Sequence, residues 1–355
     1  MIHDFELTQL PSRVIFGAGK LSAVKDEVER LGARRALVLA TKYQVELADE
    51  VAEQLGDLCV GVHAKAEQHV PYRTVEEALD LVNDFDADIL VAPGGGSTIG
   101  LAKGIVLEKQ MPILAIPTTY AGSEMTHIWG ISKDGRKTTG RNSIVKPSTV
   151  IYDPELIVSL PAKMSITSGI NAMAHAVEAL YAENRNPISS MMAEESVRNL
   201  AKGLPQVAKS PTDVDARKLT LYGSWLAATV LDQVGMALHH KLCHTLGGSF
   251  GMPHAEVHTV ILPYAITYNQ SYAPEMVAAM ARALDCKPAD VAGAVQDISR
   301  HNGGPVSLKE LNFIEADIVE AAKIAAQNPY FNPRPVIEAD IINLLKQAYS
   351  GERPS

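Results

Sequence analysis

Short apolar runs alternate with longer amphipathic stretches over the first 155 residues of the chain. Each run is rich in Val, Ile and Leu and is bounded by turn-forming residues, which is typical of a buried β-strand. Six runs predict strands, at residues 12–17, 34–41, 58–64, 88–97, 112–120 and 148–153. Apolar positions at helical spacing predict helices at residues 20–32, 44–56 and 74–86. This alternation of strands and helices favours a mostly parallel sheet covered by helices.

The pattern changes after residue 156. Residues 162–350 hold long Ala- and Leu-rich helical stretches and few strand signals. We therefore expect an α/β domain of the nucleotide-binding type at residues 1–156 and an all-α domain at residues 157–355. A chain of 355 residues is long enough for two domains, since single cores stop growing at roughly 250–300 residues.

Composition narrows the choice of partners and compartment. The formal charge of −9 disfavours nucleic acid and an anionic membrane as partners, although a local positive pocket can still bind an anionic substrate. The chain starts without the basic and apolar segments of a signal peptide, and no apolar stretch approaches the roughly 20 residues that span a bilayer. Three scattered cysteines argue against a disulfide framework. We expect a cytoplasmic protein.

A glycine-rich turn follows the fourth predicted strand and precedes a helix. The turn consists of Gly94, Gly95, Gly96 and Ser97. Glycines let a phosphate approach backbone N–H groups, and the N-terminus of the following helix favours negative charge. A second polar loop, with Thr118 and Thr119, follows the next strand. Two such loops at neighbouring strand ends favour a dinucleotide crevice, although three glycines also suit a plain tight turn.

The end of the second predicted strand bears on the choice of nicotinamide cofactor. A carboxylate at that point would hold a ribose diol and repel the 2′-phosphate of NADPH. The strand ends in Thr41 and Lys42 instead, so we expect both NADH and NADPH to bind, with Thr41 as a candidate contact. The same two residues are also typical of a solvated turn.

Histidines are concentrated in two segments of the second half of the chain. Asn171 and His175 are four residues apart, and therefore share one face of a predicted helix. His240 and His244 repeat this spacing on a later helix, and His254 follows the turn "GGSFGMP" that brings the chain back toward it. These five residues are the candidate catalytic cluster. The neighbouring His239 and His258 are the histidines least expected to take part.

Several motifs are spread along nearly the whole chain. They are "VIFGAG", "GGGSTIGLAK", "IPTTYAGSEMT", "GRKTTGR", "VIYDPEL", "GINAMAHAVEALY", "HHKLCHTLGG", "MPHAEVHTVILP" and "NPRPV". With these motifs the chain resembles the iron-containing alcohol dehydrogenase-like family, and "TTYAGSEMT" and "NAMAHAVEAL" resemble its reductase branch. The resemblance implies a Rossmann-like N-terminal domain, a helical C-terminal domain and a homodimer.

The resemblance also implies site residues. Metal-dependent relatives bind iron or zinc through an aspartate and three histidines, which match Asn171, His175, His240 and His254 here. A neutral amide in place of the aspartate removes the charge that balances a divalent cation. We therefore expect that no metal is required, although three imidazoles can still hold zinc. The cofactor-binding positions of the family match Gly94 to Ser97, Thr118, Thr119 and Lys137.

The activity implied by the resemblance is the NAD(P)H-dependent reduction of a conjugated double bond in a small dicarboxylate keto acid, within the degradation of aromatic compounds. Hydride addition leaves an enolate, whose oxygen needs hydrogen-bond donors. We assign His175, His240 and His254 to this role, with Asn171 as an added donor. One histidine, with an unperturbed pKa near the working pH, or a bound water is expected to deliver the proton. His244 is expected beside the nicotinamide.

The two carboxylates of such a substrate need cationic or hydrogen-bonding partners. The Pro-rich segment "NPYFNPRPV" at residues 328–336 carries Arg334, whose guanidinium can hold a carboxylate as a bidentate fork. Tyr120, in the threonine loop, is a second candidate for substrate binding. A solvated arginine in a surface loop is the alternative interpretation of Arg334.

Three other functions stay open. One is a metal-dependent alcohol or polyol dehydrogenase with iron or zinc on His175, His240 and His254. Another is a lyase similar to dehydroquinate synthase, whose chemistry needs several phosphate-binding basic residues that this site region lacks. The last is a non-catalytic nucleotide sensor, which would have no need of so many titratable groups. The reductase is the favoured function.

Overall fold

The computed structural model describes residues 4–133 and 136–354, which fall into two compact units. Residues 9–159 form one unit, and residues 160–354 form the other together with residues 4–8. The division lies a few residues after the expected boundary at residue 156. Of the helices in this described part of the chain, none combines the length and the apolar character needed to cross a membrane.

The unit of residues 9–159 is built on a six-stranded sheet in which every pairing is parallel. The strand order is β1-β8-β5-β4-β2-β3. The strands are β1 (Arg13–Phe16), β2 (Ala36–Leu39), β3 (Cys59–His63), β4 (Ile89–Gly94), β5 (Ile113–Pro117) and β8 (Thr149–Tyr152). All six lie in the apolar runs of the sequence, which confirms the expected mostly parallel sheet. Helices cover both faces of such sheets, which is why the strands are almost continuously apolar.

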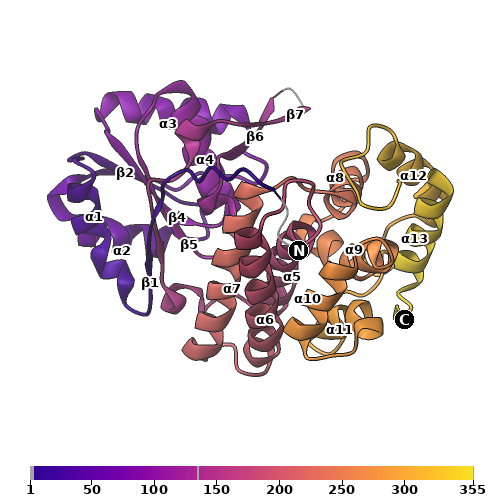
Figure 1. Cartoon of the computed structure of the whole chain (residues 1–355). Helices are drawn as coiled ribbons and strands as arrows, with labels where there is room; N and C mark the ends of the chain where they lie inside the picture. The colour runs from indigo at the N-terminus through magenta and orange to yellow at the C-terminus, as the bar shows by residue number, and fades with distance from the viewer. Residues whose placement is uncertain (1–3, 134–135, 355) are drawn as a thin grey trace. The chain divides into compact units, whose positions relative to one another are not determined.

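Four α-helices connect these strands (Figure 1), namely α1 (Val24–Arg30), α2 (Val45–Leu55), α3 (Tyr72–Asp84) and α4 (Gly96–Glu108). Helices α1 and α2 bury Val28 and Val51 in a core shared with Val38 of β2. An antiparallel hairpin of β6 (Ile128–Lys133) and β7 (Arg136–Arg141) was not expected. Strand β7 is largely exposed and carries the sequence "RKTTGR", so no buried apolar run marks it.

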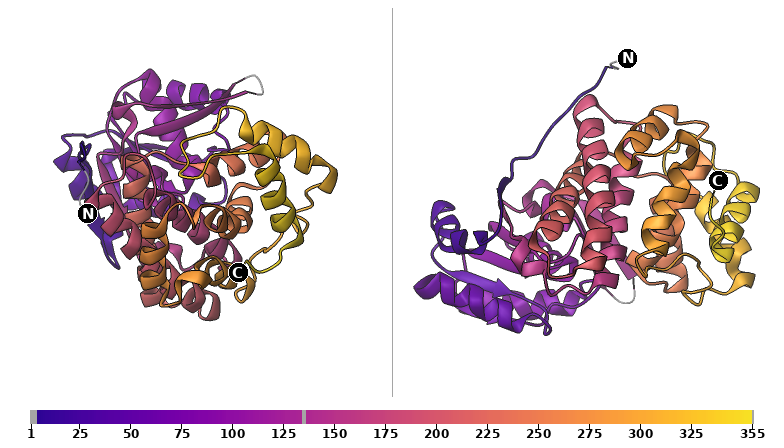
Figure 2. Two further views of the ribbon diagram at one scale, coloured as in Figure 1. Left: turned by 45° about the vertical axis from the view of Figure 1, so that its right-hand side comes forward. Right: turned by 90° about the horizontal axis from the view of Figure 1, so that it is seen from below.

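Among the described residues of the other unit the regular elements are all helices, joined by loops, which confirms the expected all-α domain. Its helices are α5 (Ala162–Ala179), α6 (Pro187–Lys209), α7 (Val214–Gln233), α8 (Leu238–Phe250), α9 (His254–Asn269), α10 (Pro274–Leu284), α11 (Val291–Arg300), α12 (Ile318–Ala326) and α13 (Glu338–Ser350). Helices α5, α6 and α7 pack side by side, and Figure 2 shows them from two further directions. A separate apolar core joins α8 and α9 to α12 and α13.

Helix α5 carries Asn171 and His175 and is buried on nearly every side. A helix that is buried all round is enclosed by its neighbours. Helix α6 packs closely against α5. At Gly169 a Cβ atom would lie 2.4 Å from Cδ2 of Leu204 in α6, so only glycine permits this approach. Asn186 precedes α6 as its N-cap residue, and its side chain caps the first turn by accepting from two backbone N–H groups.

Replacing Gly169 by alanine is expected to lower the free energy of unfolding by about 1–3 kcal/mol, because the added methyl group overlaps Leu204 in a packed core. Gly248 in α8 is the matched control, since a Cβ there meets nothing within 4 Å and alanine is the better helix former. Denaturant unfolding of the two variants measures the difference. A Gly169→Ala protein as stable as the parent would contradict the packing.

Candidate active site

The glycine-rich turn joins β4 to α4 and is packed too tightly for side chains. A Cβ on Gly94 would lie 2.3 Å from Oγ1 of Thr98, and a Cβ on Gly95 would lie 2.9 Å from Thr119. Gly96 and Ser97 open α4, so their backbone N–H groups belong to the free end of a 13-residue helix. The turn therefore has the form expected of a phosphate cradle.

Two further loops meet this turn. Gln44 lies just before α2, and its Nε2 donates to Oγ1 of Thr118 at 2.6 Å. The Oε1 atom of the same Gln44 accepts from Oγ1 of Thr41 at 3.3 Å. The backbone N–H of Thr118 donates to the carbonyl of Gly94 at 3.2 Å. Strand order reverses between β2 and β4, where ligands of open parallel sheets bind. The predicted cofactor residues Thr41, Thr118 and Gly94 are thus brought together.

Lys103, which the sequence analysis missed, holds the threonine loop in place. Its side chain is almost fully buried in α4, and Nζ donates to the backbone carbonyls of Ser123 at 2.6 Å, Thr126 at 2.8 Å and Ile128 at 2.8 Å. These carbonyls follow Thr118 and Thr119 along the same segment. The available signal was a lone lysine in the apolar helix sequence "GSTIGLAKGIVLE", because a buried ammonium group must find acceptors.

Two further predicted residues of this unit are Tyr120 and Lys137. Tyr120 is fully buried in the threonine loop, and Lys137 is exposed on β7. Their assigned contacts with substrate and cofactor stay predictions.

Six histidines of the helical unit form one contiguous cluster, namely His175, His239, His240, His244, His254 and His258. Ring centroids are 5.0 Å apart for His175 and His240, 5.9 Å for His240 and His244, and 4.5 Å for His254 and His258. His258 completes the chain of contacts, since its ring lies 4.9 Å from that of His240. The four predicted catalytic histidines therefore lie in one cluster. His258, which was expected not to take part, contacts both His240 and His254.

Five polar atoms of the cluster are buried without a hydrogen-bond partner among the described residues. They are Oδ1 of Asn171, Nδ1 of His175, Nδ1 of His239, Nε2 of His240 and Nε2 of His258. Buried polar atoms are nearly always paired in folded proteins, so such a group indicates a site that pairs with a ligand. His244 and His254 are more exposed than these residues.

Glu178 is a second residue that the sequence analysis missed. Its carboxylate is fully buried on α5, and Oε2 lies 2.7 Å from Nδ1 of His240. Oε2 also accepts from the backbone N–H of Ala237 at 2.8 Å, and Oε1 accepts from that of His240 at 3.3 Å. Ala237 has no side-chain cap of its own, so Glu178 caps α8 from another helix. The sequence signal was a glutamate one turn after His175 in "HAVEALY".

Burial sets the protonation states of this cluster. Desolvation lowers the pKa of His175 well below its usual range and lowers the pKa of His240 to about 3, with the neighbouring histidines adding to the effect. These imidazoles are therefore neutral at pH 7. The expectation of an unperturbed histidine pKa is wrong for both residues. Desolvation raises the pKa of Glu178 to about 7 against the opposing backbone hydrogen bonds.

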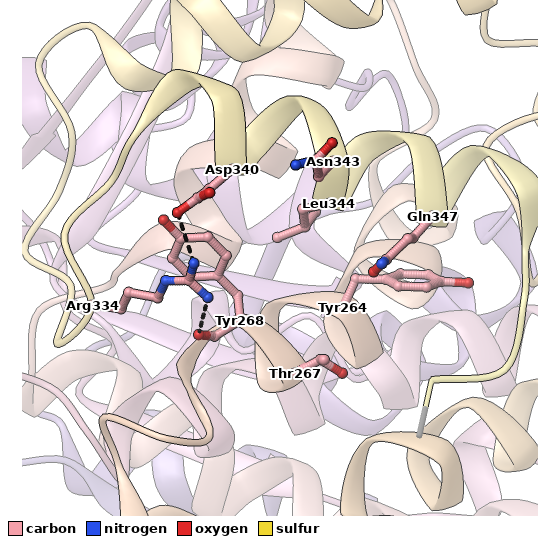
Figure 3. A pocket seen from close by; sticks show the side chains of 8 residues that line it. All are labelled: Tyr264, Thr267, Tyr268, Arg334, Asp340, Asn343, Leu344 and Gln347. Atoms are coloured by element: carbon pink, nitrogen blue, oxygen red, sulfur yellow. Dashed lines mark hydrogen bonds and ion pairs between the residues drawn. The ribbon is translucent and has the colours of Figure 1, made fainter.

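The Pro-rich segment does reach the cluster, but with a different residue from the one expected. The hydroxyl of Tyr330 lies 3.1 Å from Nδ1 of His244. Arg334 instead pairs with Asp340 and stacks on Tyr268 (Figure 3). Tyr330 is thus a third residue of the candidate site that the sequence analysis missed.

A metal ion is not favoured by the geometry at the family's ligand positions. Among the described His, Cys, Asp and Glu side chains, one trio alone brings its ligand atoms within 4.8 Å of one another, and it is His239, Cys243 and His258. His175, His240 and His254 do not form such a set, and the fourth position is the amide of Asn171. The independence from metal stays a prediction.

The trio itself is held by its own hydrogen bond. His239 Nε2 lies 2.9 Å from His258 Nδ1, and Cys243 Sγ lies 3.6 Å from the same His239 atom. Metal-bound imidazoles almost always donate their outer N–H to an acceptor. The outer nitrogens of both histidines have no partner in the described part of the chain. The trio therefore fits a packed polar core better than a metal site.

Comparisons with known proteins agree along the whole chain. The profile described as iron-containing alcohol dehydrogenase matches residues 11–154, and the C-terminal profile of the Fe-containing alcohol dehydrogenase family matches residues 165–349. The maleylacetate reductase of Sphingobium indicum is 51% identical over 99% of each chain. The crystal structure of maleylacetate reductase from Agrobacterium tumefaciens has a TM-score of 0.96 at 45% identity, covering 99% of this chain and 100% of that one.

A more distant solved structure has the same fold. That of 1,3-propanediol oxidoreductase has a TM-score of 0.90 at 26% identity, and the match covers 98% of this chain and 100% of the other.

Replacing Lys103 by methionine is expected to weaken NADH binding by about tenfold, because three buried carbonyls lose their donor and the threonine loop loosens. Fluorescence titration with NADH measures the Kd. Lys109→Met, at the exposed end of the same helix, is the control and is expected to bind like the parent. An unchanged Kd for a folded Lys103→Met protein would show that the buried ammonium does not position the loop.

Proposed function

The chain belongs to the iron-containing alcohol dehydrogenase family, and from that premise we propose that it reduces the conjugated double bond of maleylacetate to give 3-oxoadipate at the expense of NADH or NADPH. The observation that carries the proposal is the similarity to relatives named maleylacetate reductase, which are 48–51% identical to this chain over its full length. The buried His175 and His240, whose pKa values burial lowers, support it. A homodimer in the cytoplasm stays a prediction.

The cofactor is assigned to the turn at the end of β4. When bound there, NAD(P)H supplies a hydride to the alkene carbon remote from the ketone. The amide groups of Gly95 and Gly96 suit the pyrophosphate, and Thr41 and Thr118 border the same turn. The end of β2 has no carboxylate to repel a 2′-phosphate, which supports the use of both cofactors.

The enolate that follows needs donors at its oxygen. Neutral imidazole groups and the Asn171 amide can donate N–H bonds without a buried positive charge. His175 suits this task, because it is buried and its Nδ1 has no partner among the described residues. Asn171, buried one turn before it on α5, can add the N–H of its amide Nδ2.

The proton for the enolate carbon is assigned to Glu178 and His240 acting together. A protonated Glu178 donates to Nδ1 of His240, which places the imidazole proton on Nε2. Transfer from Nε2 to carbon, with transfer from Glu178 to Nδ1, leaves a carboxylate and a neutral imidazole. The pair avoids an imidazolium, which burial disfavours. Overall, one hydride and one proton add across the double bond, and NAD(P)+ is released.

The reduction is tested by the initial rate of NADH oxidation with maleylacetate, using protein treated extensively with a strong chelator. Rapid turnover and formation of 3-oxoadipate are expected, because the donors and the proton source are side chains. No turnover, followed by recovery on adding zinc or iron, would favour the metal-dependent alcohol or polyol dehydrogenase. No NADH oxidation in either condition, by protein that still binds NADH, would refute the substrate assignment.

The pH dependence tests the proton source. Since the pKa of Glu178 is raised to about 7 in the free enzyme and its protonated form is the donor, kcat/KM is expected to fall as pH rises through about 7. Glu178→Gln holds no transferable proton, so we expect kcat to fall by about 10²-fold and this titration to disappear. Glu194→Gln, at a surface ion pair, is the control. A Glu178→Gln enzyme with the parent's pH midpoint would refute the relay.

A further inference from the structure

The segment that brings Tyr330 to His244 is a proline-rich loop, residues 327–337, between α12 and α13. Prolines at 329, 333 and 335 fix three backbone φ angles, and Asn328 adopts a left-handed φ of 51° that asparagine tolerates. The loop therefore gives up little conformational entropy when it is held in place. The two residues that anchor it, Asn332 and Arg334, follow Tyr330 along the chain.

One anchor is a reciprocal pair of amides. Asn332 Nδ2 donates to Oδ1 of Asn269 at 2.7 Å, and Asn269 Nδ2 donates back at 2.9 Å. Asn269 ends α9, is fully buried and is also a hydrogen-bond partner of Tyr181. The hydroxyl of Tyr181 in turn lies 3.5 Å from Oε1 of Glu178. The loop is thus connected to the carboxyl group beside His240.

The other anchor is Arg334, seen in Figure 3 between α9 and α13. Its guanidinium lies over the ring of Tyr268 at 4.0 Å, donates to the Tyr268 carbonyl at 3.3 Å and pairs with Asp340 at 2.7 Å. The Tyr268 hydroxyl donates to the carbonyl of Pro335 at 2.7 Å. Arg334 thereby fixes the loop to both helices.

The same contacts leave Arg334 poorly placed for a substrate at the histidines. Tyr268 follows His254 by 14 residues on one helix, which is about 21 Å along its axis. A six-carbon diacid bound at His254 is much shorter than this separation. A substrate carboxylate at Arg334 would also have to compete with Asp340, which already neutralises the guanidinium.

We propose that Arg334 is a positioning residue: through Asp340, Tyr268 and the adjoining Asn332–Asn269 pair, it holds the loop so that Tyr330 meets His244. The role of Tyr330 in the reaction rests on the proposed function, whereas the anchoring of the loop does not.

Three variants test the assignment, namely Arg334→Met, Asp340→Ala and the double variant. If Arg334 acts through Asp340, each single change lowers kcat with maleylacetate by about tenfold and leaves KM within about twofold of the parent value. The kcat of the double variant is then no lower than that of the slower single variant. Arg334→Lys, which keeps the charge but not the stacked fork, is expected to recover part of the loss. Arg282→Met, which breaks an ion pair on α10, is the matched control.

Hydrogen exchange of residues 327–337, measured without substrate, gives a readout that does not depend on the reaction. Faster exchange in Arg334→Met and Asp340→Ala, but not in Arg282→Met, supports the anchor even if maleylacetate proves not to be the substrate. A KM more than about tenfold higher in Arg334→Met, with parent-like kcat and exchange, would overturn the proposal and return Arg334 to the substrate. Unchanged exchange in both anchor variants would overturn it as well.

Discussion

The arrangement of the histidine cluster depends on one buried carboxylate. Glu178 of α5 accepts from backbone N–H groups at the start of α8, a helix whose own N-cap residue is alanine. Since α8 carries His240 and His244, the same carboxylate sets where these rings lie, and it also meets Nδ1 of His240 directly. An amide could not replace it without cost, because both of its oxygens face N–H donors and a glutamine has only one acceptor oxygen.

The other unit uses a buried basic side chain for a similar purpose. Lys103 of α4 donates to carbonyls of the segment that follows β5, and so joins the helix behind the glycine turn to the threonine loop. In both units an ionisable side chain on a rigid helix satisfies backbone groups of another segment. Loops carry the functional groups of many proteins, and a buried, fully paired charge is a strong means of fixing them because misplacing it is costly.

The parts that the sequence predicts well are those with local signals. Six strands follow apolar runs, and the i,i+4 spacing at His240 and His244 is visible without a structure. Glu178 was missed because its partner His240 lies 62 residues away. Within residues 328–336, charge complementarity to a dianion points to the cation Arg334. Nothing in the sequence marks Tyr330, and the pairing of Arg334 with Asp340 is visible only in the structure. Burial, which lowers the histidine pKa values, was likewise invisible.

Under the proposed function, the charge of the substrate assists its own protonation. A dicarboxylate arriving beside Glu178 disfavours a second buried anion, and a nearby like charge raises the pKa of a carboxyl group. Glu178, whose pKa burial already brings to about 7, is therefore held in its protonated form while the substrate is bound. Hydride transfer then moves negative charge onto the enolate, which strengthens the pull on the proton at His240 Nε2. An aspartate at Asn171 would add a further buried anion close to His175, so the neutral amide suits a dianionic substrate whether or not a metal ion binds.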